Sequence, residues 1–468
     1  MSQPDIEILN GVKKIHLIGI GGIGMSGIAE YLLRKGYEVS GSDMTLTDIT
    51  ARLHSLGAKI SEGHTGEYLH QDTDLVVYTA AVHDDNPEFK KAAAYGMKMI
   101  KRAEMLGHIV NGMYLIAVAG THGKTTTTSM IAKVLLDNDY DPTVFVGGNV
   151  SFLEGASSRI GNGKYAVVEA DEYDRSFHRL KPDVAVITNV EYDHSDIYSS
   201  FADMKKAFAD FCKNLKKDGK IVACGDDENM RGVVEMSGIK EAMYYGLEKD
   251  NDYRIRQIKY SKDGVRFLLR KKEVHLHIFG EHNILNASAT RIAARIAGIK
   301  FGGFQKSMET YKGVQRRLEL KYDGKVKVFD DYAHHPTEIN ATMDAVKRMK
   351  PKRIITVFQP HLYSRTRDFH KEFAEALKKN DILILAKIYP AREAPIEGVT
   401  SEMILNDLSE REKKKAFYIQ NEQEIYSMLY DNIKKGDYII FQGAGTITNY
   451  CNEFVSLLEK RNEMAHTA

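Results

Sequence analysis

The sequence has little cysteine and no long apolar run, and each absence excludes a class of protein. Its three cysteines are too few for a disulfide-stapled scaffold and lack the C-x-x-C spacing of a zinc site. No apolar stretch reaches the roughly 18 residues that span a bilayer. The apolar residues 15–20 run into glycines without a signal-peptide cleavage pattern. We therefore expect a cytoplasmic protein that makes no contact with a membrane.

A surplus of charge is also missing, since 65 Lys and Arg residues face 64 Asp and Glu residues for a net charge of +1. Proteins that bind nucleic acid usually carry a basic stripe that replaces counterions. Here the basic pairs, such as Lys13-Lys14 and Arg316-Arg317, are short and scattered. We expect small-molecule substrates and no nucleic-acid partner, and the sequence leaves monomer and dimer equally open.

The chain is long enough for several domains, because single hydrophobic cores stop growing at roughly 250–300 residues and this chain has 468. Short apolar runs at 14–18 and 114–119 each meet glycines and then a helical pattern, as in βαβ units of a parallel sheet. Apolar and polar residues alternate within 253–278, which predicts a small antiparallel patch. From 326–329 onward, predicted strands and helices alternate again. The predicted fold class is α/β with three domains, at 1–111, 112–312 and 313–468. The first and last are Rossmann-like, and the central one has a parallel sheet with the antiparallel patch.

The first glycine-rich turn predicts a diphosphate site. Gly19, Gly21 and Gly24 satisfy G-x-G-x-x-G between a strand and a helix, so the backbone and the helix N-terminus can approach a diphosphate. Asp43 follows about twenty residues later at a strand end, where dinucleotide folds bind ribose. A nicotinamide cofactor and a UDP-sugar are both compatible with this pattern. A turn that serves only close packing is the alternative.

The second glycine-rich turn, residues 120–126 (GTHGKTT), predicts a nucleoside triphosphate. Backbone amides would cradle the phosphates, Lys124 would reach the transferred group, and the Thr125 hydroxyl would bind Mg²⁺. The strict pattern asks for a glycine where this chain has Val118, but the strand-loop-helix context supports the assignment. A structural turn without a ligand is the alternative.

Carboxylates gather at the end of a later strand, in residues 169–174 (EADEYD). Mg²⁺ prefers oxygen ligands, and ATP phosphates would complete its coordination. Residues 189–194 (NVEYDH) end a neighbouring strand, so both polar tips are expected to flank the same phosphates. Thr125, Glu169 and His194 are thus the predicted metal ligands, with a solvated acidic loop and a structural histidine as the alternatives.

Three further polar segments are ambiguous alone. Residues 280–287 (GEHNILNA) open a helix with amide side chains suited either to adenine or to capping. In 329–336 (FDDYAHHP), acids and histidines precede Pro336, which suits the first helical position. Arg365 follows another strand end and could grip a carboxylate or phosphate, or make only a surface ion pair.

These blocks, in this order, resemble the Mur ligases of peptidoglycan precursor synthesis over nearly the whole chain. The matching blocks are 19–27 (GIGGIGMSG), 120–128 (GTHGKTTTT), 169–177 (EADEYDRSF), 280–287 (GEHNILNA), 330–338 (DDYAHHPTE) and 389–393 (YPARE). The resemblance implies an N-terminal UDP-binding domain, a central ATPase domain and a C-terminal domain that closes over ATP and the amino acid. The first glycine-rich turn then holds UDP in place of NAD.

Within the family, the resemblance is to the branch that adds L-alanine to UDP-N-acetylmuramate. It implies that ATP, with Mg²⁺, phosphorylates the lactyl carboxylate and that the L-alanine amine attacks the acyl phosphate. Such an acid-amino acid ligase serves cell-wall biogenesis, and through it cell shape and cell division.

The resemblance also implies a set of site residues, carried over motif by motif. The catalytic residues would be Lys124, Glu169 and His194, and the metal ligands Thr125, Glu169 and His194. ATP would contact Gly120, Thr121, His122, Gly123, Lys124, Thr125, Thr126, Asn283, Arg316, Asp331 and His335. The UDP-sugar substrate would contact Gly21, Gly22, Gly24, Met25, Ser26, Ser42, Asp43, His64, Thr79, His122 and Arg365.

Other functions fit parts of the pattern. The recycling ligase that joins a preformed tripeptide to the same UDP-sugar shares several blocks, although the short connection at 175–182 looks more like the alanine-adding branch. An NAD-dependent oxidoreductase would fit the first glycine-rich turn, but the G-K-T of the second turn would then have no function. A non-catalytic UDP-sugar-binding protein would leave Lys124, Glu169 and His194 unexplained.

Overall fold

The computed structural model describes residues 7–467 except 195, 262 and 392, and side chains as far as 461. The ends of the predicted first and third domains, residues 1–6 and 468, therefore lie outside the described residues. Arg392, in the block at 389–393, lies outside them as well. Among the described residues, no helix combines the length and the apolar character needed to cross a membrane.

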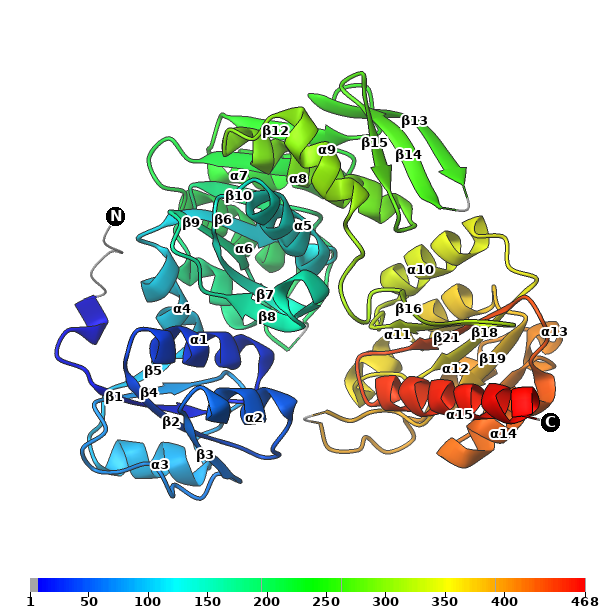
Figure 1. The fold of residues 1–468 in the computed structure, drawn as a ribbon, viewed down its shortest axis with the longest axis horizontal. Coiled ribbons are helices and arrows are strands. Elements are labelled where there is room, and N and C mark those ends of the chain that lie inside the picture. Colours follow the sequence, from blue (N-terminus) through cyan, green and yellow to red (C-terminus); the bar gives the residue numbers. More distant parts are fainter. Residues whose placement is uncertain (1–6, 195, 262, 392, 468) are drawn as a thin grey trace. The chain divides into compact units, whose positions relative to one another are not determined.

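Three sheets form the framework, which confirms the predicted three-domain α/β class (Figure 1). They divide between two compact units. The first unit comprises residues up to 259, 266–277 and 283–312, and the second comprises 260–265, 278–282 and 313–468. The first unit contains two of the three sheets, so the predicted boundary near 111 does not separate two compact units. The exact boundaries remain a prediction.

The first sheet is parallel, with strand order β3-β2-β1-β4-β5. Its elements are η1 (Glu7–Leu9), β1 (Lys14–Ile18), α1 (Ile23–Arg34), β2 (Glu38–Asp43), α2 (Asp48–Ser55), β3 (Lys59–Glu62), β4 (Leu75–Tyr78), α3 (Pro87–Ala94), β5 (Met99–Lys101) and α4 (Arg102–Val110). The chain runs outward from β1 in both directions, to β2 and to β4. Ligands bind at such a switch point, outside the carboxyl ends of the strands. The first glycine-rich turn lies there.

The second sheet has ten strands in the order β15-β14-β13-β12-β11-β10-β6-β9-β7-β8. Its strands are β6 (Tyr114–Ala119), β7 (Thr143–Val150), β8 (Ala156–Arg159), β9 (Tyr165–Glu169), β10 (Val184–Ile187), β11 (Lys220–Cys224), β12 (Ala242–Gly246), β13 (Tyr253–Ser261), β14 (Gly264–Leu269) and β15 (Lys272–Leu276). Its helices are α5 (Lys124–Asp137), η2 (Ser151–Leu153), η3 (Tyr173–Arg179), α6 (Phe201–Lys213), α7 (Glu228–Ser237), α8 (Glu281–Ile296) and α9 (Phe301–Glu309). β6 lies between β9 and β10 and pairs with both in parallel, so the two predicted polar tips flank the second glycine-rich turn.

The predicted antiparallel patch is found at one end of this sheet. β14 and β15 are joined by only Arg270 and Lys271, whose φ angles of 49° and 68° give the tight hairpin turn that antiparallel strands use. At the other edge, β7 and β8 also pair antiparallel.

The first two sheets share one continuous apolar core. Helix α1 contacts β7 and β8 of the second sheet as well as β2 of its own. A Cβ on Gly27 of α1 would lie 2.9 Å from Ser158 Cβ and 3.0 Å from a Phe145 ring carbon, so a larger residue there would push the helix away. This shared packing explains why the first two sheets form a single unit.

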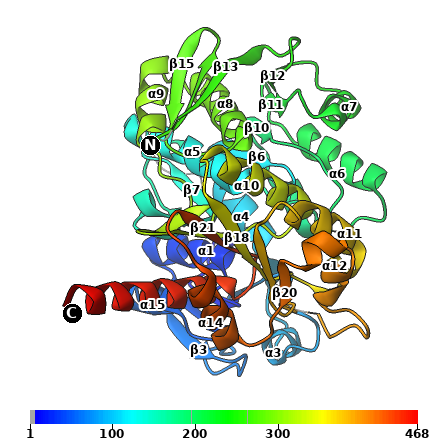
Figure 2. The same ribbon diagram turned by 90° about the vertical axis from the view of Figure 1, so that its right-hand side faces the viewer.

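The third sheet has the order β16-β17-β21-β18-β19-β20, with β16 antiparallel at one edge. Its elements are β16 (Glu319–Asp323), β17 (Lys327–Asp331), α10 (Pro336–Arg348), β18 (Arg353–Phe358), α11 (Tyr363–Leu377), β19 (Ile382–Leu385), α12 (Glu402–Asn406), α13 (Glu410–Lys413), β20 (Ala416–Tyr418), α14 (Glu422–Asn432), β21 (Asp437–Gln442) and α15 (Ile447–Thr467). Separate apolar clusters cover its two faces, one with α14 and α15 and the other with α10, α11 and α12. Figure 2 shows α15 as a long helix beside β21. The predicted Rossmann-like arrangement of this part is confirmed.

Candidate active site

The first glycine-rich turn is held by backbone and carboxylate hydrogen bonds. Ser42 O accepts from the N–H groups of Gly19 and Ile20 at 2.8 and 2.9 Å, and Asp43 Oδ2 accepts from Gly21 N–H at 2.8 Å. A Cβ on Gly21 would lie 2.9 Å from Asp43 Oδ2. Helix α1 begins after Gly22, which supplies no side-chain cap, so the first amides of the helix can donate to a ligand oxygen.

A buried acid supports this turn from behind. The Ser42 hydroxyl is fully buried, donates to Glu88 and is 2.8 Å from His64 Nδ1. Burial tends to raise the pKa of the Glu88 carboxyl, but hydrogen bonds from His16 and Ser42 outweigh burial and the pKa is lowered. Ser42 and His64 therefore brace the turn, and the predicted substrate contacts of both residues remain a prediction.

Two further predicted substrate residues have buried side chains. Met25 is 1 % exposed and its side chain belongs to the apolar core, because it faces inward from the first turn of α1. Ser26 is buried too, and its hydroxyl donates to Ile23 O at 3.0 Å. Their substrate contacts remain a prediction, since both side chains are directed into the protein. By contrast, Gly22 and Gly24 are exposed, and Thr79 Cγ2 would lie 3.3 Å from a Cβ on Gly19, so Thr79 borders the turn.

The second glycine-rich turn requires glycine at two positions. Gly120 has φ of +134° and a Cβ there would lie 2.0 Å from Thr188 Oγ1. Gly123 has φ of +83° and a Cβ there would lie 2.8 Å from Asn286 Oδ1. Helix α5 begins after Gly123 without a side-chain cap. The first turn of this helix therefore has the geometry of a phosphate cradle.

Residues of β10 and its polar tip fix this second turn from the side. Asn189 Oδ1 accepts from His122 N–H at 2.9 Å, and Thr188 Oγ1 donates to His122 O at 2.5 Å. Thr121 Oγ1 donates to Glu191 O at 3.1 Å. His122 Nε2 lies 3.3 Å from Glu191 Oε2. The predicted juxtaposition of the β10 tip with the phosphate turn is thus confirmed.

Lys124 lies inside its own turn. Its Nζ donates to Gly120 O at 2.6 Å, to Thr121 O at 3.1 Å and to Glu172 Oε1 at 2.9 Å. Burial tends to lower the pKa of the Lys124 ammonium, but the charge of Glu172, then Asp171 and Glu169, outweighs burial and raises the pKa. Lys124 therefore carries its positive charge at neutral pH.

Two predicted metal ligands are hydrogen-bonded to each other. Thr125 Oγ1 donates to Glu169 Oε1 at 3.1 Å, and Gly147 N–H donates to Glu169 Oε2 at 2.7 Å. A Cβ on Gly147 would lie 2.7 Å from both carboxylate oxygens, which shows how closely the backbone approaches this acid. A hydroxyl and a carboxylate next to a phosphate cradle are the oxygen donors that Mg²⁺ takes from proteins. This pair fits Mg²⁺.

Glu172 links the lysine to the third predicted metal ligand. It is 1 % exposed, and Oε1 lies 3.5 Å from His194 Nε2 as well as within hydrogen-bond distance of Lys124. Burial tends to lower the pKa of His194, but the hydrogen bond to Glu172 and the charge of Asp193 outweigh burial and the pKa is raised. Tyr198 OH donates to Glu172 O at 2.6 Å and fixes this residue's backbone.

Glu172 is a site residue that sequence reasoning missed. The acidic segment at 169–174 pointed to several carboxylates, but nothing in its pattern distinguished a buried acid from solvated ones. Asn286, one of the two amide side chains in the block at 280–287, is placed at the phosphate turn. It borders Gly123, and its Nδ2 donates at 3.3 Å to Asn283 Oδ1, which brings the predicted Asn283 to the same turn. The remaining predicted residue of this turn, Thr126, is buried in α5.

The predicted ATP residues of the second unit cluster around the end of β17. Arg316 Nη2 donates to Gly443 O at 2.7 Å. Asp331 is buried and accepts from Thr342 Oγ1 at 2.6 Å and from Gln442 Nε2 at 2.9 Å, while burial raises the pKa of its carboxyl. His335 caps α10 through Thr337 N–H, ahead of Pro336. The capping alternative for 329–336 is thus confirmed for His335, a buried residue.

Arg365 belongs to a second group in the same unit. Its Nη1 lies 3.4 Å from His361 Nδ1, and the His361 ring stacks on Tyr389 at 5.8 Å between centroids. Only 8 % of Arg365 is exposed. A mostly buried guanidinium beside stacked rings is suited to a carboxylate, so the cation at this strand end is more than a surface ion pair.

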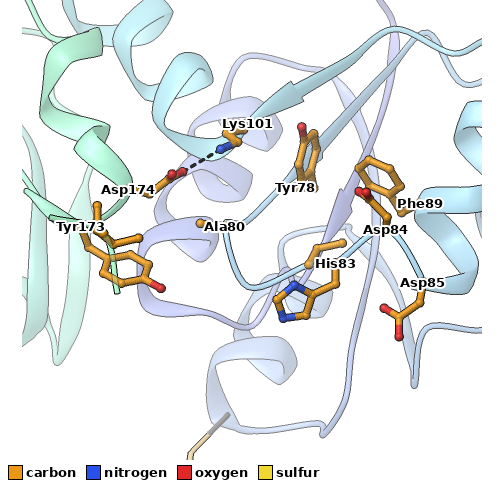
Figure 3. Close-up of a pocket in the computed structure, with 11 residues that line it drawn as sticks. Tyr78, Ala80, His83, Asp84, Asp85, Phe89, Lys101, Tyr173 and Asp174 are labelled. Carbon is orange, nitrogen blue, oxygen red and sulfur yellow. Dashed lines mark hydrogen bonds and ion pairs between the residues drawn. The ribbon is translucent and has the colours of Figure 1, made fainter. Parts of the chain in front are cut away.

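A cavity of about 610 Å³ opens in the first unit beside the end of β4 (Figure 3). Tyr78 of β4, His83 of the loop after β4 and Lys101 of β5 line it, together with Tyr173 and Asp174 of the segment that follows β9. Lys101 Nζ donates to Asp174 Oδ2 at 2.8 Å across the cavity wall. The cavity thus connects the switch point of the first sheet with the acidic segment of the second.

Comparison with known proteins agrees with this geometry. Residues 14–114, 118–294 and 316–445 match the sequence profiles described as "Mur ligase family, catalytic domain", "Mur ligase middle domain" and "Mur ligase, glutamate ligase domain". The UDP-N-acetylmuramate--L-alanine ligase of Geotalea daltonii is 41% identical over 455 residues, covering 96% of this chain and 99% of that protein.

Two solved structures are also similar. A UDP-N-acetylmuramate-alanine ligase from Thermotoga maritima has a TM-score of 0.83 and 30% identity, covering 96% of this chain and 99% of the other. A murein peptide ligase from Psychrobacter arcticus has a TM-score of 0.72 and 23% identity, covering 95% of this chain and 98% of the other, which shows a common fold.

Proposed function

The chain belongs to the Mur ligase family, and on this premise we propose that it joins L-alanine to the lactyl carboxylate of UDP-N-acetylmuramate, driven by ATP. The single observation that carries the chemical part of the proposal is the group around the second glycine-rich turn. There a charged lysine, a Thr-carboxylate pair and a buried acid meet at the uncapped start of α5. This group is built to move a phosphoryl group.

In the first step, the lactyl carboxylate oxygen attacks the γ-phosphorus of ATP, and the bond to the β,γ-bridging oxygen breaks to release ADP. The N–H groups of the second turn hold the phosphates, and the Lys124 ammonium balances the negative charge that spreads over the transferred group. For this role Lys124 Nζ exchanges its contacts with Gly120 O and Thr121 O for phosphate oxygens. Glu172 keeps the ammonium in position during the exchange.

In the second step, the amine of L-alanine attacks the carbonyl carbon of the acyl phosphate. The tetrahedral intermediate collapses, the bond from carbon to the phosphate oxygen breaks, and inorganic phosphate leaves while the amine loses a proton. Two anionic substrates and an amine must meet in one place, so positioning supplies a large part of the acceleration. Arg365 is proposed to hold a substrate carboxylate, because its guanidinium is nearly buried and can bind in a bidentate way.

Mg²⁺ is the proposed cofactor beside ATP. Thr125, Glu169 and His194 would hold it, and it would supply charge compensation for the phosphates. The donor set of Thr125 and Glu169 supports this assignment, and His194 is tied to the same group through Glu172.

The other site residues are proposed on the family resemblance. Around ATP we assign the phosphate turn from Gly120 to Thr126 with Asn283, and from the second unit Arg316, Asp331 and His335. For the UDP-sugar we assign Gly21, Gly22, Gly24, Asp43, Thr79 and His122, with Ser42 and His64 as supports of the turn. We propose domains at 1–111, 112–312 and 313–468, and a cytoplasmic location follows from the substrates.

The recycling ligase that attaches a tripeptide is the second candidate. The 23% identity of the murein peptide ligase from Psychrobacter arcticus carries only the fold, whereas the alanine ligase from Geotalea daltonii is 41% identical over nearly its full length. The comparison therefore favours the alanine-adding activity.

The test is phosphate release from ATP with Mg²⁺ and UDP-N-acetylmuramate, comparing L-alanine, glycine, L-serine and the L-Ala-D-Glu-diamino-acid tripeptide, with the product weighed by mass spectrometry. We expect release with L-alanine and a product heavier by one alanine residue. Turnover with the tripeptide alone would make the protein a recycling ligase. No release with any acceptor would leave a UDP-sugar-binding protein without this activity.

A further inference from the structure

Tyr198 lies four residues after His194 and shortly before α6, and none of the sequence motifs described above includes it. Its ring is fully buried in the apolar core that the first two sheets share. A buried tyrosine needs a partner for its hydroxyl, because an unpaired polar group in the core destabilises the fold. The partner that this hydroxyl takes belongs to the phosphoryl-transfer group.

The backbone of Tyr198 closes the turn that carries His194. His194 has a φ of 56°, in the left-handed region that residues other than glycine seldom adopt. The N–H groups of Ile197 and Tyr198 both donate to His194 O, at 2.9 and 3.0 Å. These two bonds help to hold the turn in its strained conformation. The position of the His194 side chain therefore depends on where Tyr198 lies.

The side chain of Tyr198 is bonded to Glu172, the buried acid after β9. Its hydroxyl donates to Glu172 O at 2.6 Å, and the Arg175 N–H donates to the same oxygen at 3.0 Å. Oε1 of Glu172 lies 2.9 Å from Lys124 Nζ and 3.5 Å from His194 Nε2. Tyr198 thus holds the backbones of both Glu172 and His194, whose side chains meet each other.

Strand pairing does not set the distance between these two backbones. Glu172 follows β9 and His194 follows β10, and β6 lies between those two strands in the sheet. β9 and β10 each form a ladder with β6, and neither forms one with the other. The bond from the Tyr198 hydroxyl to Glu172 O joins the two tips directly.

The ring of Tyr198 has a support of its own, which does not depend on the hydroxyl. The Arg175 guanidinium lies over the ring at 5.0 Å from its centroid, and Arg175 Nη2 donates to both carboxylate oxygens of Asp203 at 2.8 Å. Burial raises the pKa of the Tyr198 hydroxyl, so the hydroxyl keeps its proton at neutral pH and continues to donate. Tyr198→Phe is therefore expected to remove one hydrogen bond and to leave the ring in place.

We propose that Tyr198 is a positioning residue, which holds Glu172 and His194 at the separation that phosphoryl transfer requires. This inference rests on the proposed function, because it takes the group around the second glycine-rich turn as the site of that transfer. Stabilisation of a transition state depends on charges that are fixed in advance, so a small shift of Glu172 would displace the Lys124 ammonium and slow the chemistry. Binding of ATP and of the UDP-sugar would change little, because Tyr198 is buried behind the site and touches neither.

The experiment measures phosphate release from ATP, with UDP-N-acetylmuramate and L-alanine, by the full-length wild type, Tyr198→Phe and Tyr165→Phe. Tyr165 is the matched control, because it is also buried and its hydroxyl donates to a backbone oxygen, Ala297 O, at 3.3 Å. It lies at the opposite end of β9 from Glu169. We expect Tyr198→Phe to lower kcat about tenfold, with KM for ATP and for the UDP-sugar within about threefold of wild type. Tyr165→Phe should keep kcat within about twofold, although each variant loses one buried hydrogen bond and should lower the thermal midpoint slightly.

A double-mutant cycle with Glu172→Gln tests whether Tyr198 acts through Glu172. In the Glu172→Gln background the charge that Tyr198 positions is already removed. We therefore expect the further change Tyr198→Phe to lower kcat by less than about twofold in that background. A tyrosine that only stabilised the fold would cause the same loss in both backgrounds.

Three results would overturn the assignment. A wild-type kcat in Tyr198→Phe would show that the hydroxyl positions nothing that the reaction needs. Equal losses of kcat in Tyr198→Phe and Tyr165→Phe would make the effect one of general stability. An undiminished loss in the Glu172→Gln background would show that Tyr198 does not act through Glu172. The wild type's own failure to release phosphate with any acceptor would be a separate result, which would refute the proposed function and this inference with it.

Discussion

The two glycine-rich turns of the first unit start from the same backbone design and differ in charge. Each follows a central strand of a mostly parallel stretch of sheet, and each opens a helix behind a glycine without a side-chain cap. At the first turn a carboxylate, Asp43, accepts a hydrogen bond from the turn itself. At the second, the carboxylates of Glu169 and Glu172 instead face Thr125 and Lys124.

This difference separates binding from chemistry. A turn whose own residues offer amides and a fixed carboxylate can hold a ribose diphosphate, but it has no mobile cation to follow charge as it develops. A turn with a buried, charged lysine and oxygen ligands for a metal can stabilise a phosphoryl group in transfer.

Replacing Lys124 should cause the largest loss. We expect Lys124→Ala to lower phosphate release at least about a hundredfold, because a charge aimed at the transferred group is removed. Binding of the UDP-sugar should stay within about threefold of wild type, measured by calorimetry. Lys133→Ala, on the same helix and paired with Asp137, is the matched control and should keep full activity. Equal losses of chemistry and of UDP-sugar binding in Lys124→Ala would contradict the division.

Replacing Glu169 should raise the Mg²⁺ concentration that phosphate release requires. We expect Glu169→Gln to raise the Mg²⁺ concentration for half-maximal phosphate release by about 10- to 100-fold, since a charged oxygen donor is lost. Asp174→Asn removes a charge from the same acidic segment, but its carboxylate pairs with Lys101. This control should keep the Mg²⁺ concentration for half-maximal release near that of wild type. A similar rise of that concentration in both variants would argue against a metal role for Glu169.

Replacing Asp43 should affect the first turn alone. We expect Asp43→Ala to raise KM for the UDP-sugar by about tenfold with kcat and KM for ATP little changed, because one hydrogen bond that sets the turn is lost. Asp48→Ala, an exposed acid at the start of α2, is the control. A fall in kcat with unchanged KM for the UDP-sugar would show that the first turn takes part in the chemistry.

The acid behind the first turn predicts a smaller effect on stability. Because the folded-state pKa of Glu88 lies below its usual value of 4.5, ionised Glu88 stabilises the fold above that pH. The stabilisation is lost as the pH falls through the lower folded-state pKa. The difference in unfolding free energy between wild type and Glu88→Gln should therefore be constant near pH 7 and shrink below about pH 4.5, measured by urea unfolding. Glu62→Gln, on an exposed strand end, is the control, and a difference independent of pH would contradict this account.

Local patterns made much of this site predictable. The second turn follows from the strand at 114–119 and the G-K-T that continues it, and the structure gives β6 the same bounds. The meeting of the β9 and β10 tips followed from the shared edge of parallel strands. Pro336 starts α10 as the sequence indicated. In each case the signal lies within a few residues of the feature.

The rest depends on contacts that the sequence does not encode locally. Met25 lies in a matching motif, yet its direction along α1 places it in the core. Glu172 is one of several acids in its segment, and only the fold brings it to Lys124, 48 residues earlier. Likewise, the shared core of the first two sheets depends on the close packing of Gly27 on Ser158. No sequence pattern predicts that these two residues are in contact.

In the proposed reaction, the first turn presents a carboxylate of a bound UDP-sugar to the phosphoryl-transfer group of the second. The most direct test uses UDP-N-acetylmuramate with both lactyl carboxylate oxygens labelled with ¹⁸O, incubated with ATP, Mg²⁺ and L-alanine. If the carboxylate attacks the γ-phosphorus and the amine then displaces phosphate, one ¹⁸O passes into each released phosphate and one stays in the amide. Released phosphate without ¹⁸O, alongside amide product, would rule out an acyl phosphate intermediate, because the carboxylate would then never have been phosphorylated.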